Sequence, residues 1–470
     1  MRSTKIVATI GPASQDLGVL EAMITAGMDV ARLNFAHGTP DGQAKTAEMV
    51  REAAERAGRR VAILGDIPGP KLRLGVIAAG MVDVSTGAEL VLTNRSEEGS
   101  PGRLPVVWQG LPDLVEKGDV IYLSDGAIRL RVERTAGEDV FTEVEVGGSV
   151  ASRQGINLPN VTMSLPTVSA DDFKLIDAAL DMGVDLLALS FVRRAEDLDP
   201  VREHLRARGS DVPLIAKIEK PQAASAAEEI IDAADGIMIA RGDLGIELPI
   251  EEVPLVQKRL LALAGRRAVP AITATQMLES MVHSKRPTRA EVADVANAIF
   301  DGTDAVMLSQ ETAVGDHPVE AVKMMAAIAT TTERELPYGR WLAERGPQAS
   351  NQYHVIAFGA VGAVYQLGLK AIVSPTRSGS TARLISAYRP RAPVLALCTS
   401  PEVMRRCTLL WGVRATMRED SESTLDLIDA CAAAAVEEGV AKKGDKIGIT
   451  AGLPPGRSGG TNLFKVHEIE

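Results

Sequence analysis

The sequence predicts an α/β protein built around a closed (β/α)8 barrel, with an all-β domain inserted after the third strand and a smaller α/β domain at the C-terminal end. Apolar runs of strand length recur with helical patterns between them, which is typical of βαβ units on a parallel sheet. Three such runs precede, and five follow, a segment rich in Gly, Val, Thr and Glu. Eight parallel strands, each followed by a helix, are what a closed TIM barrel requires.

The first three strands are expected at residues 5–10, 30–35 and 61–67. From residue 75 to about residue 166, alternating segments such as AELVLTN and VFTEVEV indicate the inserted β domain. Helical sequence resumes at SADDFKLIDAALDMG, where Ser169 is a good N-cap residue and Asp171 and Asp172 fall in the first turn. The other five strands are expected at residues 186–191, 213–219, 236–241, 270–276 and 305–309.

A further α/β section follows the helix that ends near Glu335. We interpret its apolar strings YHVIAF, AIVSPT, PVLALCT and KIGITAG as strands, and expect a long Ala-rich helix after Ser423. A chain of 470 residues with 46% hydrophobic residues is too large for one core. The predicted domains are the barrel at 1–74 and 165–335, the β domain at 75–164 and the C-terminal domain at 336–470.

Composition excludes several classes of function. The net charge of −11 argues against a nucleic-acid partner, and no run of apolar residues is long enough to span a membrane. No signal peptide is apparent, and the three cysteines are typical of core residues in a reducing compartment. The six histidines lack the i, i+4 spacing of a zinc site. We therefore expect a cytoplasmic protein.

The active site of such a barrel lies at the C-terminal ends of its strands. Caps or ion pairs could account for any one polar residue there. Together, however, the carboxylates, one lysine and several arginines at one mouth indicate a charged substrate and a hard metal ion. These strand-end residues are Arg32, Asn34, Asp66, Arg73, Ser190, Lys217, Glu219, Arg241, Asp243, Thr275, Gln276, Ser309 and Glu311.

Glu219 and Asp243 follow neighbouring strands and offer only oxygen ligands, so they could hold Mg²⁺ while water and substrate fill its other positions. Lys217 precedes Glu219 by two residues and therefore lies on the same face of its strand. In RGDLGIEL, glycines on both sides of Asp243 stand at the start of a helix, where bare amides could bind a carboxylate or phosphate. A plain tight turn would explain the glycines equally well.

Several long strings resemble the pyruvate kinase family: MRSTKIVATIGPAS, MDVARLNFAHG, GPKLRLG, LLALSFVR, IAKIEKPQA, GIMIARGDLGIELP, ITATQMLESMVHSKRPTRAEVADVANAIFDGTDAVMLSQETAVGDHPVEAV and TRSGSTARLISAYRPRAPVLALC. They cover nearly the whole chain in the expected order. The resemblance implies transfer of a phosphoryl group from phosphoenolpyruvate to ADP, giving pyruvate and ATP. It also implies a divalent cofactor, Mg²⁺ or Mn²⁺, and a homotetramer.

The resemblance also assigns roles to individual residues. Glu219 and Asp243 correspond to the metal ligands, and Lys217 to the cation that stabilises the phosphoryl group in transfer. By the same resemblance, Arg32 and Arg73 bind phosphate, the amides of Gly242 and Asp243 bind the substrate carboxylate, and Ser190 binds substrate. Thr275 helps place the proton near the enolate carbon. Nucleotide or monovalent-ion contacts are implied for Asn34, His37 and Pro12.

The strand end ILGDIPGPKLRLG departs from the family's potassium-dependent members. The resemblance implies potassium ligands at Asn34, residue 36, Asp66 and the carbonyl of Ile67, but residue 36 is alanine here and offers no side-chain oxygen. Lys71 stands where those members have glutamate. We hypothesise that the Lys71 ammonium replaces potassium, so that potassium is not required.

The β domain resembles the family's mobile lid, in which Asp125 and Arg153 match positions near the nucleotide and Gln154 departs from a common lysine. In the C-terminal domain, the loop Thr376, Arg377, Ser378, Gly379, Ser380 and Thr381 joins a strand to a helix and could cradle phosphate. By resemblance, this loop and Arg457 would bind an allosteric activator that is a phosphorylated metabolite.

Two alternatives stand beside this interpretation. One is another metal-dependent enzyme of the phosphoenolpyruvate/pyruvate barrels, a lyase or aldolase, which would not need the lid or Lys217 between two substrates. The other is a catalytically silent metabolite-binding protein, against which the intact set of Arg73, Lys217, Glu219, Asp243 and Thr275 speaks.

Overall fold

The computed structural model describes residues 2–69, 72–108, 110–124, 126–159, 166–346, 351–421, 423–452 and 460–470. Eight parallel strands close into a barrel in the order β1-β16-β15-β14-β13-β12-β3-β2, which confirms the predicted fold class. The barrel strands are β1 (Lys5–Thr9), β2 (Val30–Asn34), β3 (Ala62–Ile67), β12 (Leu186–Leu189), β13 (Leu214–Ile218), β14 (Gly236–Ala240), β15 (Ala271–Ala274) and β16 (Ala305–Leu308).

Helices surround the barrel because its strands are apolar on both faces and need cover on the outside. Helix α4 begins as predicted, with Ser169 as its N-cap and a capping box to Asp172. The helices are α1 (Leu17–Ala26), α2 (Pro40–Arg56), α4 (Ala170–Asp181), η1 (Ala195–Leu198), α5 (Asp199–Ala207), α6 (Pro221–Ser225), α7 (Ala227–Ala233), α8 (Arg241–Glu247), η2 (Ile250–Glu252), α9 (Val253–Arg266), η3 (Glu279–Val282), α10 (Arg289–Phe300), α11 (Gln310–Ala313), α12 (Pro318–Thr332) and η4 (Glu333–Glu335).

The β domain between β3 and α4 has its own core and two sheets. A six-stranded sheet runs β11-β7-β8-β9-β5-β6, and a two-stranded sheet pairs β10 with β4. The elements are β4 (Met81–Val84), β5 (Glu89–Thr93), β6 (Arg103–Pro105), α3 (Leu111–Leu114), β7 (Val120–Leu123), β8 (Ile128–Ala136), β9 (Asp139–Val146), β10 (Gly148–Ala151) and β11 (Ile156–Asn157).

The C-terminal domain carries a five-stranded sheet of order β19-β18-β17-β20-β21. Our interpretation of YHVIAF as a strand is wrong, because it lies in helix α14, where Ala357, Ala360, Val361 and Val364 are buried at helical spacing. The elements are α13 (Tyr338–Arg345), α14 (Gln352–Leu367), β17 (Ile372–Thr376), α15 (Ser380–Ala387), β18 (Val394–Cys398), α16 (Pro401–Arg406), η5 (Cys407–Leu409), β19 (Val413–Met417), α17 (Thr424–Glu437), β20 (Lys446–Ala451) and β21 (Leu463–Glu468).

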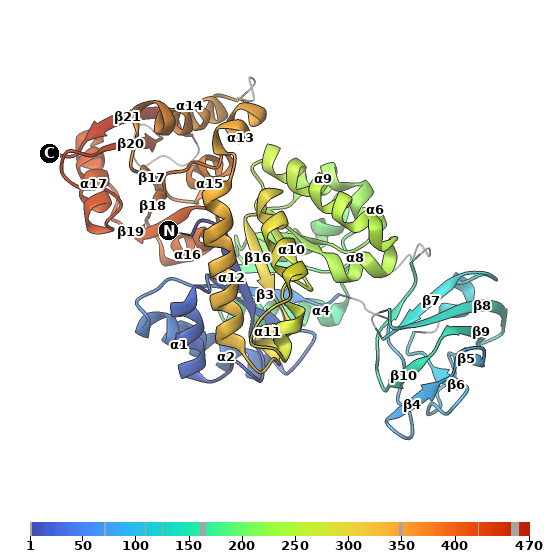
Figure 1. Cartoon of the computed structure of the whole chain (residues 1–470). Coiled ribbons are helices and arrows are strands. Elements are labelled where there is room, and N and C mark those ends of the chain that lie inside the picture. Colours follow the sequence, from blue (N-terminus) through green and yellow to red (C-terminus); the bar gives the residue numbers. More distant parts are fainter. Residues whose placement is uncertain are drawn as a thin grey trace.

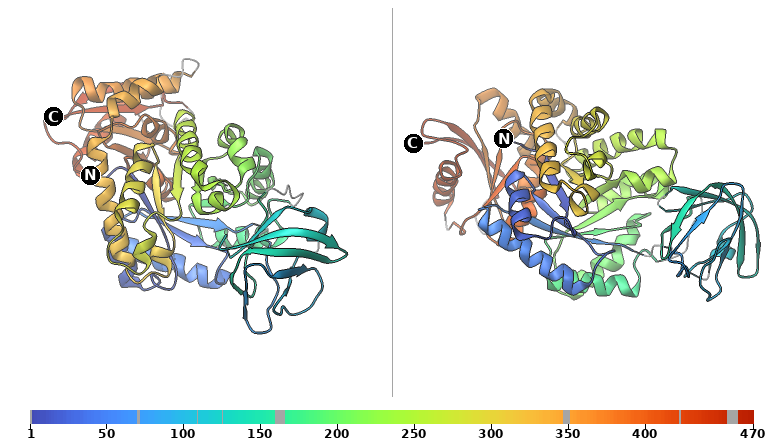
Figure 2. Two further views of the ribbon diagram at one scale, coloured as in Figure 1. Left: turned by 45° about the vertical axis from the view of Figure 1, so that its right-hand side comes forward. Right: turned by 60° about the horizontal axis from the view of Figure 1, so that its bottom comes forward.

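The β domain and the C-terminal domain lie on opposite sides of the barrel (Figure 1), as two further views also show (Figure 2). The C-terminal domain contacts the end of the barrel where the strands begin. There the Lys5 ammonium donates to the Val413 carbonyl at 2.7 Å, and the buried Arg389 pairs with Asp304 at 2.6 Å. The opposite end, where the strands finish, faces the β domain and carries the candidate site.

Candidate active site

An ion network crosses the barrel mouth between β2, β3 and β13. Asp66, at the end of β3, is 1% exposed. One of its oxygens accepts from the Arg32 guanidinium at 2.6 and 2.7 Å, and the other lies 3.2 Å from the Lys217 ammonium. Arg32 also donates to the Thr9 hydroxyl at 3.0 Å. Parallel strand pairing therefore brings together three charged residues from distant parts of the chain.

The Lys217 ammonium has three polar partners. Its ammonium lies 2.8 Å from Glu219 and donates to the Ser190 hydroxyl at 2.7 Å, in addition to its contact with Asp66. Burial alone would lower the pKa of Lys217, but the charges of Asp66 and Glu219 outweigh it and raise that pKa well above its ordinary value. Lys217 is therefore a fixed positive charge at neutral pH.

The pKa of Asp66 shifts in the complementary direction. Burial alone would raise it, but the charges and hydrogen bonds of Lys217 and Arg32 outweigh burial and hold the pKa below its ordinary value. The network thus pairs a buried carboxylate with two cations. An arriving phosphate would meet cations that are already ordered.

Glu219 and Asp243 suit a divalent metal by ligand type and by position. Glu219 follows β13, Asp243 lies in the first turn of α8 after β14, and these two strands are neighbours in the barrel. The second Glu219 oxygen accepts from the Phe191 amide at 3.1 Å, which orients the carboxylate. Within the described residues no group of three or more His, Cys, Asp or Glu could hold a metal. Water and substrate oxygens would complete the coordination of a cation on this pair.

Thr275 lies directly after β15 and faces the start of α8. The Gly242 amide donates to the Thr275 hydroxyl oxygen at 2.7 Å, and that hydroxyl donates to the Ala274 carbonyl at 2.6 Å. Thr275 and Gln276 have positive φ angles of 69° and 53°. Such angles are unusual for a β-branched residue and mark a backbone that its surroundings must hold.

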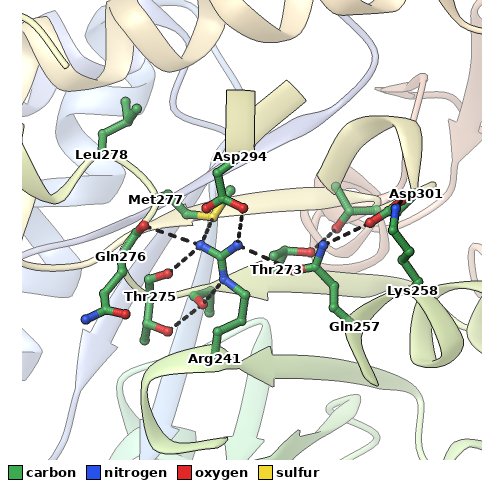
Figure 3. A network of polar contacts seen from close by, with 12 residues as sticks. Arg241, Gln257, Lys258, Thr273, Thr275, Gln276, Met277, Leu278, Asp294 and Asp301 are labelled. Carbon is green, nitrogen blue, oxygen red and sulfur yellow. Dashed lines mark hydrogen bonds and ion pairs between the residues drawn. The ribbon is translucent and has the colours of Figure 1, made fainter. Parts of the chain in front are cut away.

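Arg241 supplies much of that support (Figure 3). Its guanidinium donates to the Thr275 carbonyl at 2.8 Å and pairs with Asp294 of α10 at 2.7 Å. Figure 3 shows the same group directed at the Gln276 carbonyl and the Met277 sulfur. Arg241 thus ties the end of β15 to helix α10.

The predicted nucleotide and monovalent-ion residues lie at the ends of β1, β2 and β3. The Asn34 side-chain oxygen accepts from the Ala36 amide at 3.1 Å, the His37 amide donates to the Asn34 carbonyl at 3.2 Å, and Pro12 is exposed in the loop after β1. Ile67 is the last residue of β3. Lys71, on which the potassium hypothesis depends, lies outside the described residues.

Two other predicted residues lie where the β domain meets the barrel. The Arg73 guanidinium donates to the Arg153 carbonyl at 3.3 Å, so these two residues are brought together. The Gln154 side chain caps a local turn by accepting from the Ala151 amide at 2.7 Å. Asp125 lies outside the described residues.

The loop after β17 lines a cavity of about 100 Å³ in the C-terminal domain. The Thr376 hydroxyl accepts from the Gly379 amide at 2.9 Å, and Gly379 has a φ of 81°, which glycine adopts without strain. Arg377 pairs with Asp420 across the cavity, and Ser378, Ser380 and Thr381 complete the loop's contribution. Arg457 lies outside the described residues.

Sequence reasoning collected the strand-end residues but missed the partners that hold some of them. It did not find Asp294, because this residue lies on a helix and far along the chain from Arg241. It also missed Glu247, which pairs with Lys220 beside the site. The positive φ angles after β15 had no signal in the sequence, since neither Thr nor Gln favours that conformation.

The mouth of this (β/α)8 barrel combines a buried lysine, a paired arginine and two acidic residues at neighbouring strand ends. This combination defines a class of enzymes that neutralise an anionic substrate with the help of a metal ion. Comparison with known proteins makes the assignment specific. Residues 1–322 match the family model described as "Pyruvate kinase, barrel domain", and residues 354–467 match "Pyruvate kinase, alpha/beta domain". The chain belongs to the pyruvate kinase family, whose members are phosphotransferases.

Relatives with that name match over essentially the full chain. A pyruvate kinase of Thermococcus litoralis is 45% identical over 99% of this chain and 98% of its own length. Those of Geobacillus stearothermophilus and Staphylococcus aureus are 44% and 42% identical over 100% of this chain, and 80% and 81% of their own lengths. The lyase or aldolase alternative is not favoured. Within the described residues no helix is long and apolar enough to cross a membrane.

Proposed function

We propose that this chain transfers the phosphoryl group of phosphoenolpyruvate to ADP, giving pyruvate and ATP. The observation that carries the proposal is the buried Lys217 ammonium, held between Asp66, Glu219 and the Ser190 hydroxyl at the barrel mouth. Phosphoryl transfer needs positioning and charge neutralisation more than covalent help from the protein. A permanently charged lysine between two carboxylates and a hydroxyl is suited to that task.

Each residue then has a defined part in the reaction. Lys217 and Arg32 neutralise the phosphoryl oxygens, and Arg73 approaches them from the β-domain side. The amides at the start of α8, those of Gly242 and Asp243, receive the substrate carboxylate, which replaces the Thr275 hydroxyl as the acceptor of the Gly242 amide. Closure of the β domain excludes water, which would otherwise accept the phosphoryl group in place of ADP.

Members of the family generally need a divalent metal, and we assign Glu219 and Asp243 as its protein ligands. A bound Mg²⁺ or Mn²⁺ supplies positive charge that stabilises the phosphoryl group in transfer. We expect Glu219→Gln to weaken Mn²⁺ binding to the free enzyme by about tenfold or more, because a neutral amide replaces a charged ligand. Electron paramagnetic resonance of free Mn²⁺ measures this without turnover. Glu279→Gln, at a residue outside the site, is the matched control, and equal affinities in both variants would contradict the assignment.

The potassium requirement is a separate part of the proposal. Ala36 offers no side-chain oxygen, the side-chain oxygen of Asn34 accepts from a backbone amide, and both Asp66 oxygens contact cations. These observations support the idea that Lys71 supplies the charge of a monovalent ion. Turnover with potassium replaced by tetramethylammonium should be unchanged, and Lys71→Glu should make turnover depend on potassium. Strong activation of the unchanged enzyme by potassium would refute this part alone.

We further propose that the cavity beside the 376–381 loop binds a phosphorylated activator, and that the chain acts as a homotetramer in the cytoplasm. An effector phosphate would compete with Asp420 for Arg377 and accept from the amides at the start of α15. Saturation curves for phosphoenolpyruvate, recorded with a panel of sugar phosphates and AMP, test the regulatory part. Hyperbolic curves that no effector shifts would exclude it.

The central experiment is a coupled assay for pyruvate and ATP formed from phosphoenolpyruvate and ADP with Mg²⁺. Lys217→Ala should lower kcat by about 100-fold or more, because it removes the charge that stabilises the transition state. Lys174→Ala, at an exposed position on α4, should leave kcat unchanged. No product from the unchanged protein, or equal kcat values for the two variants, would overturn the proposed function.

A further inference from the structure

The end of β15 is held in a conformation that its own residues do not favour. Thr275 and Gln276 both have left-handed φ angles, and a β-branched residue in that region is an outlier. Left-handed residues persist only where surrounding contacts fix them, and they cluster at functional sites. Contacts from residues near Thr275 must therefore hold the backbone of this turn in its left-handed conformation.

Arg241 contacts the backbone of this turn. Its guanidinium reaches three consecutive carbonyl oxygens, those of Ala274 at 3.4 Å, Thr275 at 2.8 Å and Gln276 at 3.4 Å. The side chain is only 12% exposed. Three acceptors in a row match the planar fork of an arginine, and the single ammonium of a lysine could not reach them all.

Asp294 orients the guanidinium group of Arg241. It pairs with the outer guanidinium nitrogen at 2.7 Å and is itself 39% exposed. Gln257 approaches the same nitrogen at 3.4 Å and donates to Asp301 at 3.1 Å. These contacts, drawn in Figure 3, run from the surface of α10 to the strand end. The Thr275 hydroxyl oxygen accepts from the Gly242 amide.

We propose that Arg241, oriented by Asp294, is a positioning residue for the Thr275 hydroxyl. The inference rests on the proposed function and on the role near the enolate carbon that the family resemblance implies for Thr275. In the forward reaction the bond from phosphorus to the enol oxygen breaks and a bond from phosphorus to a terminal ADP oxygen forms. The enolate carbon then gains a proton, which water supplies through the Thr275 hydroxyl.

This role predicts separate effects on the two halves of the reaction. Phosphoryl transfer depends on Lys217 and Glu219, whose partners are Asp66, Ser190 and the Phe191 amide. Proton transfer depends on Thr275, whose backbone Arg241 holds. Loss of Arg241 should therefore impair the proton step more than the phosphoryl step.

Two rates measured on each variant test the inference. The first is ATP formation from phosphoenolpyruvate and ADP, and the second is exchange of pyruvate methyl protons with D₂O, followed by proton NMR with Mg²⁺ and ATP present. In Arg241→Gln, exchange should fall about tenfold further than ATP formation. Arg241→Lys should recover only part of the loss. Asp294→Ala, at a partly exposed position, should show the same imbalance to a smaller extent.

The decisive comparison uses Thr275→Ala as the background. If Arg241 acts through Thr275, adding Arg241→Gln to Thr275→Ala should change exchange by less than about twofold. Arg51→Gln is the matched control, because Arg51 also links an aspartate, Asp185, to two backbone carbonyls, but at the opposite end of the barrel. It should leave the ratio of the two rates unchanged.

Equal losses of ATP formation and exchange in Arg241→Gln, or a full additional loss in the Thr275→Ala background, would overturn the positioning role and leave the proposed function intact. An unchanged enzyme that forms no ATP from phosphoenolpyruvate would instead overturn the proposed function, and this inference with it.

Discussion

At the scale of single residues, the mouth of the barrel depends on one buried carboxylate. Asp66 contacts both Arg32 and Lys217, and all three side chains are largely shielded from water. Breaking a buried pair by neutralising one partner is costly, because the remaining charge is left in a poorly solvated place. Here Arg32 would lose its carboxylate partner, and Lys217 would keep only its ion pair with Glu219.

We therefore predict that Asp66→Asn lowers the free energy of unfolding by about 3 to 5 kcal/mol. Urea unfolding followed by circular dichroism measures the change. Asp171→Asn, which removes an exposed carboxylate from α4, should leave the unfolding midpoint where it is. A midpoint for Asp66→Asn equal to that of the unchanged protein would contradict the role given to this network.

The same carboxylate predicts a dependence of stability on pH. The pKa of Asp66 is lower in the folded chain than in the unfolded one, so the folded state binds fewer protons. Its contribution is fully present above the unfolded aspartate pKa of about 3.9 and is lost as the pH falls through the lower folded value. Stability measured in urea between pH 7 and pH 3 should fall less steeply for Asp66→Asn at the acid end.

Residue types at strand ends were predictable from the sequence, whereas the contacts among them were not. The alternation of strand and helix patterns located Asp66, Lys217 and Asp243 at strand ends, because parallel strands bring their C-terminal ends to one mouth of the barrel. That Asp66 would pair with Lys217 depends on which strands become neighbours across the site and on side-chain direction. Neither is encoded in local periodicity.

At the scale of elements, the start of α4 was predicted correctly because its signals are local. Ser169 precedes α4, its hydroxyl accepts from the Asp172 amide at 3.1 Å, and the Asp172 carboxylate accepts from the Ser169 amide at 2.8 Å. By contrast, the string YHVIAF gave no local signal that separates a short buried strand from the start of a helix. Only the continuation of its buried positions through Val364 resolves that ambiguity.

We predict that Ser169→Ala lowers the free energy of unfolding by about 1 kcal/mol, because it removes one half of the capping box. Ser169→Thr should recover most of the loss. Ser225→Ala is the matched control, since that exposed hydroxyl donates only to the Pro221 carbonyl and begins no helix. No residue of the site lies on α4, so kcat should be the same in all three variants. A fall in kcat for Ser169→Ala would show that α4 affects the mouth directly.

At the scale of the whole molecule, a chain of contacts joins the C-terminal domain to the strand that carries Thr275. Helix α15 begins at the 376–381 loop, and Arg389 follows it and is 1% exposed. Arg389 donates to one oxygen of Asp304, at 2.6 Å, and the other oxygen accepts from the amide of Ala271, the first residue of β15, at 2.9 Å. An effector that shifts α15 would therefore act on the start of that strand.

This connection predicts that Arg389→Gln uncouples the effector from the barrel. In the unchanged enzyme, we expect the activator to lower half-saturating phosphoenolpyruvate by about fivefold or more, in the usual range of allosteric coupling. In Arg389→Gln the shift should fall below about twofold. The readout is the shift in half-saturation, because a loss of stability alone would lower activity without changing the ratio. Arg406→Gln is the matched control, since Arg406 also joins the two domains but pairs with the exposed Asp211. If Arg389→Gln keeps the full shift, coupling does not pass through Asp304, and Arg389 only holds the two domains together.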